Sequence, residues 1–368
     1  MRRAGPLPWN NRLYATSRRD LLRRVAFGLT FLPALAFAPR ALLWSLFFEQ
    51  DAPLVPAKPL PPNLFTRDGK ALVVMIHGRD HEAMVAQGVA LLGGLGALSL
   101  SGKSVLVKPN VVNNRPPPST TSSLLVAAVV HMVKNAGGVV TVADSSGMLR
   151  FPTSDNLSET GIREAAESAG AQVLSLEAQP WVRVEPSLAS VSPTYLVSKP
   201  VYEADVFLNL PVVKTHQFAH YSCSLKNLVG IVHPRNRPSL RFLSGQWHEQ
   251  IAELNLAVHP QLTIADASTM MIAGGPTSGT PAQANVLLLS GDRVALDAVA
   301  VALIRSYGAW PKVQGYPIWT QRQIKRAGEL GLGVTGPNQI ELLMTSLEPQ
   351  NDEFRRRADT MRRDLMTV

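Results

Sequence analysis

Cysteine is almost missing from the 368-residue chain, which contains only Cys223. A single cysteine excludes an intramolecular disulfide, and it excludes the cysteine frameworks of iron–sulfur clusters and structural zinc sites. Cys223 itself is interpreted either as a small buried residue or as a nucleophile. Internal repeats are absent as well. The fold must therefore rest on its hydrophobic core, for which an apolar fraction of 46% is sufficient.

Charge is also scarce, at 17% of the residues, and its positive excess lies at one end of the chain. Residues 1–50 hold eight of the 36 basic residues and two of the 27 acidic ones, which leaves 28 basic and 25 acidic residues for the remainder. A nearly neutral body argues against nucleic-acid binding, which depends on the neutralisation of many phosphates. The arginines of segment 347–368 alternate with acids, which predicts a charged C-terminal helix or tail.

The basic N-terminus has the order of an export signal. Ser17-Arg18-Arg19-Asp20-Leu21-Leu22-Arg23 resembles the twin-arginine (Tat) signal, and the uncharged apolar stretch 25–38 follows it. The resemblance implies that the Tat export machinery recognises Arg18 and Arg19 and delivers a folded protein to the periplasm. Segment 34–36 provides a small-x-small cleavage site. If the signal stays uncut, the alternative is a membrane-anchored protein with 25–48 as an N-terminal tether.

Beyond this signal segment (1–50), a proline-rich linker over 51–65 leads into a single α/β domain over 66–346. Short β-branched runs in this domain alternate with helical patterns over 120–135, 158–169 and 293–307. This alternation predicts a mostly parallel sheet flanked by helices on both faces, with a small β insertion over 180–199. The expected strands are 72–76, 104–108, 139–143, 171–176, 206–210, 262–265 and 286–290.

Polar residues follow five of these strands directly. Ligands of open α/β sheets bind outside the carboxyl ends of the strands, so these residues predict a ligand site at one edge. The segments are Lys108-Pro109-Asn110, Asp144-Ser145-Ser146-Gly147, Pro211 with Lys214-Thr215-His216, Asp266-Ala267-Ser268, and Gly291-Asp292.

Several of these segments also resemble, in order and spacing, the motifs of the domain-of-unknown-function 362 family, over about residues 72–304. The resemblance implies a shared α/β fold without an assigned activity. Some relatives have ferredoxin-like cysteine clusters, which this chain lacks, so an electron-transfer role is not implied. The matching motifs are Lys108-Pro109-Asn110, Thr120-Thr121, Asp144-Ser145, Asn209-Leu210-Pro211, Lys214-Thr215-His216, Leu225-Lys226-Asn227-Leu228 with Gly230, Asp266-Ala267, Gly275-Pro276 with Gly279, and Ser290 with Asp292 and Ala295-Leu296-Asp297.

The leading hypothesis is an exported protein with a strand-end pocket for a small anionic ligand, and a metal-assisted enzyme is one form of this hypothesis. Lysine suits carboxylate and phosphate groups, so Lys108, Lys214 and Lys226 are expected to neutralise the ligand. Asn110 and Asn227 are expected to orient it. The candidate acid/base residues are Asp144, His216 and Asp266, and a divalent metal would take its ligands from His216, His220, Asp144 and Asp266.

The competing hypothesis is a non-catalytic accessory or binding protein in which the same charges form a buried structural network. His248 is expected mainly in a structural role in the first turn of a helix, with acid/base chemistry as the alternative. Asp292 is expected to cap the helix after it, and Asp297 to pair with Lys226 or Lys108 inside the core. The glycine-rich segment 274–280 is interpreted as a turn rather than a phosphate loop, and no hydrolase triad is indicated around Ser145.

Overall fold

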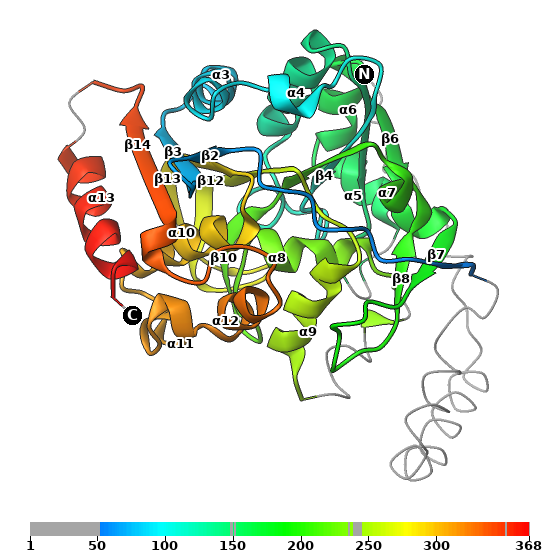
Figure 1. The fold of residues 1–368 in the computed structure, drawn as a ribbon. Helices are drawn as coiled ribbons and strands as arrows, with labels where there is room; N and C mark the ends of the chain where they lie inside the picture. Colours follow the sequence, from blue (N-terminus) through cyan, green and yellow to red (C-terminus); the bar gives the residue numbers. More distant parts are fainter. Residues whose placement is uncertain are drawn as a thin grey trace, which may run out of the picture. The chain divides into compact units, whose positions relative to one another are not determined.

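The computed structural model describes residues 52–147, 150, 152–234, 236–237, 245–349 and 352–367, which belong to one compact unit, Asp51–Val368. The signal segment with Arg18 and Arg19 lies outside the described residues. A mixed sheet forms the centre of the unit (Figure 1), with the strand order β14-β3-β13-β12-β9-β4-β5-β6. Its strands are β3 (Lys70–His77), β4 (Ser104–Pro109), β5 (Val139–Asp144), β6 (Gln172–Ser175), β9 (Val206–Leu210), β12 (Leu262–Gly274), β13 (Gly279–Ser290) and β14 (Ile340–Ser346).

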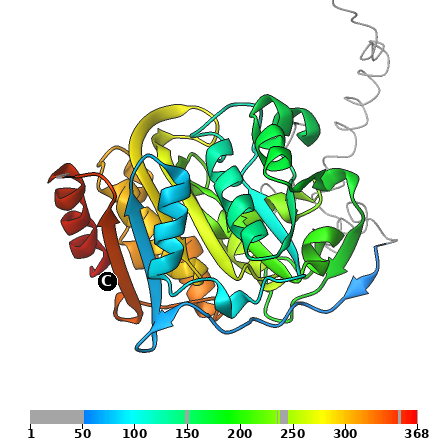
Figure 2. The same ribbon diagram turned by 90° about the horizontal axis from the view of Figure 1, so that it is seen from above.

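All neighbours along this order pair in parallel except β13, which is antiparallel to both β12 and β3. The expected mostly parallel sheet is therefore confirmed. β12 continues well past Ala265, and it turns into β13 through a long hairpin that projects at one edge of the sheet (Figure 2). The turn contains Gly274 and Gly275, both at positive φ, which favours glycine at these positions.

Helices cover both faces of the sheet, as the near-continuous apolar strands predict. Leu72, Val74 and Ile76 of β3 pack in one core cluster, and Val73 and Met75 pack in the other. On the first face lie α3 (His81–Leu91), α4 (Ser123–Asn135), α5 (Thr153–Glu159) and α6 (Ile162–Ser168), shown above the sheet in Figure 1. The other face is covered by α8 (Ser224–Asn227), α9 (Trp247–Glu253), α10 (Arg293–Arg305), α12 (Arg322–Glu329) and α13 (Asp352–Leu365).

Smaller elements complete the fold. The expected β insertion is the antiparallel pair β7 (Trp181–Val184) and β8 (Tyr195–Ser198), to which β1 (Leu54–Val55) adds in parallel. The remaining elements are β2 (Thr66–Arg67), β10 (Val212–His216), β11 (His220–Ser222), α7 (Lys199–Glu203), α11 (Pro311–Gln314) and the 3-10 turns η1 (Gly96–Leu98), η2 (Leu176–Ala178), η3 (Leu228–Ile231), η5 (Leu254–Leu256), η6 (Ile318–Thr320) and η7 (Pro337–Gln339).

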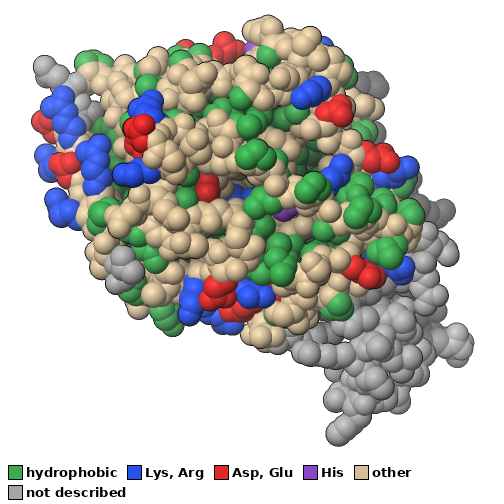
Figure 3. All heavy atoms as spheres, viewed as in Figure 1, with side chains coloured by type: hydrophobic (Ala, Val, Ile, Leu, Met, Phe, Trp, Pro, Cys, Tyr) green, Lys and Arg blue, Asp and Glu red, His purple; other side chains and the backbone are tan. Residues whose placement is uncertain are grey.

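The surface agrees with the charge distribution of the sequence. On the face shown in Figure 3, basic and acidic side chains are interspersed, most densely where α13 lies. Within this helix, Arg357 pairs with Glu353 and Arg362 with Asp359. In the part of the chain that the structure describes, no helix is both long enough and apolar enough to span a bilayer.

Candidate functional site

The ends of neighbouring parallel strands bring polar residues together at one edge of the sheet. Lys108 at the end of β4 lies opposite Asn209 of β9, and the adjacent β5 ends at Asp144. Val212, which starts β10, lies opposite Asp266 of β12. β13 runs the other way, so Asp292 lies at the opposite edge, where it accepts hydrogen bonds from the first turn of α10. The expectation that this fifth strand end joins the site is therefore wrong.

Lys108 and Asp144 form a buried ion pair. Lys108 Nζ lies 2.7 Å from Asp144 Oδ1, the two side chains are 0% and 2% exposed, and Asp144 Oδ2 accepts a hydrogen bond from Val111 N. Burial lowers the pKa of Lys108, and the Asp144 charge opposes this shift. Gly230 packs directly on the pair: a Cβ there would lie 2.8 Å from Lys108 Nζ and would overlap Asp144 Oδ1. Both charges therefore belong to the framework of the site.

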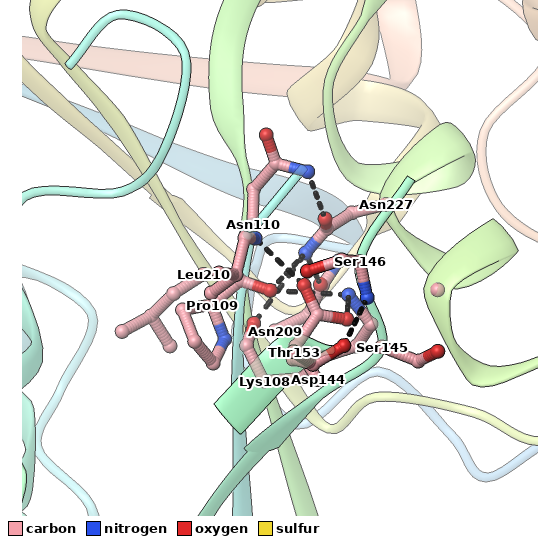
Figure 4. Close-up of polar contacts among 12 residues, drawn as sticks. Lys108, Pro109, Asn110, Asp144, Ser145, Ser146, Thr153, Asn209, Leu210 and Asn227 are labelled. Carbon is pink, nitrogen blue, oxygen red and sulfur yellow. Dashed lines mark hydrogen bonds and ion pairs between the residues drawn. The ribbon is translucent and has the colours of Figure 1, made fainter. Parts of the chain in front are cut away.

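A chain of side-chain amides runs across the strand ends (Figure 4). Lys214 Nζ donates to Asn110 Oδ1 (2.6 Å), Asn110 Nδ2 donates to Asn227 Oδ1 (3.0 Å), and Asn227 Nδ2 donates to Asn209 Oδ1 (2.8 Å). The chain ends where Asn209 Nδ2 donates to the carbonyl oxygen of Ser224 (3.2 Å). Because a lysine amine at the start only donates here, the orientation of each following amide is fixed. Asn110 and Asn227 are thus committed to each other and to the backbone around them.

The amine of Lys214 is buried, and it also donates to the carbonyl oxygen of Ser119 (2.5 Å). Among the described residues, no carboxylate forms an ion pair with it. Burial, followed by the positive charge of Lys226, lowers the pKa of Lys214 well below its usual value. The three lysines that the sequence singled out are therefore close in space, and Lys108 and Lys214 form the inner layer.

Asp266 and Asp297 fix the starts of two helices. Asp266 accepts hydrogen bonds from Ser122 N, at the start of α4, and from the backbone and hydroxyl of Ser268. Asp297 accepts from Ser224 N (2.7 Å) and Leu225 N at the start of α8, and from the hydroxyl of Tyr221. The expected lysine partner of Asp297 is replaced by these donors. Carboxylates at helix N-termini are favourable because they face unpaired N–H groups.

Asp297 gives the fold a specific dependence on pH. Burial raises the pKa of Asp297 to about 7, against the effect of the hydrogen bonds from Ser224 and Tyr221. A carboxyl whose pKa is raised on folding stabilises the protein below its unfolded pKa near 4, and this contribution is lost as the pH rises through 7. Each pH unit in that window corresponds to about 1.4 kcal/mol.

We therefore expect the stability advantage of the wild type over Asp297→Asn to shrink between pH 5 and pH 7.5. Guanidinium denaturation of both proteins at the two pH values measures it, and the comparison cancels titrations that the two share. Asp359→Asn, which changes an exposed acid of α13, serves as the control and should show no such trend. A wild-type advantage over Asp297→Asn that stays constant with pH would contradict the assignment.

His216 lies at the end of β10, where its ring is locked by the following turn. Its Nδ1 accepts hydrogen bonds from Phe218 N and Ala219 N, each 3.1 Å long. Nδ1 therefore carries no proton, and the neutral ring has its proton on Nε2. In this state Nε2 is a hydrogen-bond donor, so the neutral ring is not arranged as a general base.

His216 and His220 are four residues apart, a spacing that would place both on one face of a helix, but they lie in the strands β10 and β11. They face each other across the hairpin of β10 and β11. The ring of His220 contacts Tyr316 and His248 instead. Burial lowers the pKa of His220, and it lowers the pKa of His248 to about 4. Across the described residues, no three His, Cys, Asp or Glu side chains gather in a metal-binding arrangement.

A cavity of about 270 Å³ opens at this edge of the sheet, next to His216. We call it the strand-end pocket. Its lining combines basic side chains with apolar ones, and the lining residues that the structure describes include no carboxylate. The lining consists of Arg150, His216, Lys226 and Arg237; Val112, Phe218, Val229, Trp247 and Pro276; and Gly147 and Thr277.

Two of the residues predicted for the site, His216 and Lys226, line the strand-end pocket. The others form the layer behind it: Lys108, Asn110, Asp144, Lys214, Asn227 and Asp266. Arg237 connects the two layers, because its guanidinium donates to the carbonyl oxygens of Gly230, Val232, Ser145 and Ser146. Burial lowers the pKa of Arg237 to about 10.

Sequence reasoning missed Arg150, Arg237, Phe218 and Trp247. The two arginines lie a few residues beyond quoted motifs, Arg150 after Gly147 and Arg237 after Gly230, but they belong to none of them. Trp247 directly precedes His248, and the helix there was considered only for His248. The nearest available signal was the pair of prolines, Pro234 and Pro238, that bracket Arg237.

Comparisons with known proteins identify a related sequence and a distantly similar structure. A thylakoid-associated protein of Synechocystis sp. is 28% identical over 221 residues, which are 58% of this chain and 67% of that protein. Among solved structures, the lactate racemase apoprotein from Thermoanaerobacterium thermosaccharolyticum covers 79% of this chain and 87% of its own, with a TM-score of 0.43 and 11% identity. That likeness is too distant to inform function.

The family comparison is more direct. The family model described as "Domain of unknown function (DUF362)" matches residues 105–302, more than half of the chain. The matched region runs from β4 to α10, and it includes the ion pair, the amide chain and most of the strand-end pocket. On this evidence, the chain belongs to the domain-of-unknown-function 362 family.

Proposed function

We propose that the protein binds a small organic anion in the strand-end pocket. The observation that carries this proposal is the lining: Arg150, Lys226, Arg237 and the donor nitrogen of His216 lie around one cavity, without a carboxylate among its described lining residues. An anion entering there meets several positive charges, and burial strengthens their attraction. The guanidinium of Arg237 is largely used by backbone carbonyls, so the test of this proposal is placed on Lys226, the lysine among the described lining residues.

Binding, rather than catalysis by the predicted acids, fits the engaged state of the inner residues. Asp144 is paired with Lys108, Asp266 fixes the start of α4, and His216 accepts hydrogen bonds on Nδ1. A general base must be able to accept a proton within reach of the substrate. The proposal therefore combines a ligand pocket with a structural network behind it.

Replacing Lys226 by Met tests the proposal. We expect the Kd for inorganic phosphate or acetate to rise at least tenfold, because an ionic hydrogen bond contributes about 1.5–3 kcal/mol. Isothermal titration calorimetry at low salt measures it. Lys70→Met removes an exposed lysine at the start of β3 and is the matched control. Equal affinities of the Lys226→Met variant and the wild type would refute the pocket.

We also propose that the protein is exported through the Tat pathway and acts in the periplasm, with an N-terminal membrane tether as the alternative form. The support is the motif around Arg18 and Arg19, followed by the apolar stretch 25–38. The relative in Synechocystis sp. is named for its association with thylakoids, which are membranes. That name adds some support for a position at a membrane surface.

A further inference from the structure

Two aromatic side chains line the strand-end pocket, and they come from different segments of the chain. Trp247 starts α9 and is 9% exposed, whereas Phe218 lies in the turn between β10 and β11 and is 51% exposed. Val112, Val229 and Pro276 complete the apolar lining. A cavity for a bare inorganic anion would have little use for so much apolar surface. The lining therefore indicates a ligand that also carries an apolar group.

The indole of Trp247 has an unused hydrogen-bond donor. Its Nε1 is buried, and within the described residues it has no hydrogen-bond partner. A buried donor without an acceptor costs free energy, and buried tryptophan N–H groups usually find one. Because Nε1 is buried, a ligand in the cavity would contact the exposed part of the indole ring rather than this donor.

The positive charge of Lys226 lies next to the indole ring of Trp247. Lys226 Nζ is 5.9 Å from the centre of the Trp247 ring, within the range of a cation–π contact. An anionic group bound to Lys226 would thus place the adjoining atoms of the same ligand beside the indole. The cavity has a volume of about 270 Å³, which is room for roughly ten waters. This volume is much larger than that of a lone phosphate or carboxylate group.

Together these features define a ligand class. We propose that the ligand is an aromatic carboxylate or phosphate, with its anionic group at Lys226 and its flat ring against Trp247. The inference rests on the anion-binding function proposed above and adds the ring to it. Trp247 is then the residue that selects aromatic anions from small aliphatic ones. Stacking on one aromatic side chain is worth about tenfold in affinity.

A ligand series tests this selection with the full-length protein. Calorimetric titrations with inorganic phosphate, methyl phosphate and phenyl phosphate vary the attached group, and acetate and benzoate repeat the comparison for carboxylates. We expect phenyl phosphate to bind about tenfold tighter than methyl phosphate, and benzoate tighter than acetate. The stronger of the two aromatic ligands identifies the anionic group. Equal affinities of aromatic and aliphatic members in both series would overturn the inference.

Two substitutions separate the ring from its N–H group. Trp247→Leu should abolish the preference for phenyl phosphate over methyl phosphate, and Trp247→Phe should keep most of that preference. If Trp247→Leu does not fold, as judged by thermal melting, the ligand series with the wild type still decides. Retention of the full preference in folded Trp247→Leu would also contradict the inference.

The outcomes distinguish the two proposals. If inorganic phosphate binds in a Lys226-dependent manner but a ring adds nothing, the anion pocket stands and the aromatic ligand class fails. If neither phosphates nor carboxylates bind, or if Lys226→Met binds them as the wild type does, the anion pocket itself fails.

Discussion

Replacing Asp144 by Asn should lower the free energy of unfolding by about 3–5 kcal/mol, because it leaves the buried ammonium of Lys108 without its counter-charge. Asparagine can still accept the hydrogen bond from Val111 N, so the loss reports mainly on the charge. The neighbouring guanidinium of Arg237, also buried, adds to the uncompensated positive charge at this position. Guanidinium denaturation, with the midpoint and slope compared with those of the wild type, measures the change.

The double variant Lys108→Met/Asp144→Leu provides the matched test of this explanation. Exchanging a whole buried pair for apolar residues is often neutral, so part of the stability should return, although Val111 N and Arg237 still lose Asp144 as a partner. Glu341→Gln is the control at a solvent-accessible ion pair, in which the side chain of Arg67 is 49% exposed and that of Glu341 is 28% exposed. Breaking this pair should change the free energy of unfolding by about 0–1 kcal/mol. A loss below about 1 kcal/mol for Asp144→Asn would show that the pair is not the structural centre of the site.

The second large effect concerns export. Changing Arg18 and Arg19 together to lysine should leave nearly all of the protein in the cytoplasm, because the twin-arginine signal depends on the arginine pair. Immunodetection in periplasmic, membrane and cytoplasmic fractions measures the distribution. Net charge stays constant, so any effect reports on arginine itself rather than on the positive charge of the segment.

Arg2 and Arg3 offer a control within the same segment, since their exchange for lysine changes an arginine pair outside the motif. That variant should be exported like the wild type. Unchanged export of the Arg18/Arg19 variant would exclude the Tat route. The mass of the exported protein and its extraction from membranes by carbonate then distinguish cleavage near Ala36 from retention as a tether.

The sheet illustrates how much of the fold is predictable from apolar patterns. Segment 206–210 coincides with β9, and 104–108 lies within β4, because both strands are buried on both faces and read as continuous apolar runs. β10 was missed, since Pro211 suggested a strand end and the buried residues after it are mostly polar. β14 was missed as well, at the edge of the sheet.

For the candidate site, the sequence predicts where the polar residues gather better than it predicts what each of them does. Four of the polar strand ends meet at one edge of the sheet, and the strand-end pocket opens at this edge. However, the sequence does not reveal which lysine side chains are buried and which line the cavity. Lys108 and Lys226 both belong to family motifs, yet Lys108 is buried against Asp144 and Lys226 lines the cavity.

By itself, the sequence determined the α/β class, the family, the nearly neutral body and the polar edge of the sheet. These properties depend on composition and on local periodicity, which every short segment carries with it. Tertiary structure alone decided the antiparallel direction of β13, the partners of each buried charge, and the approach of Arg150, Arg237, Phe218 and Trp247 to one cavity. Such relations depend on contacts between residues that are far apart along the chain, and no single segment specifies them.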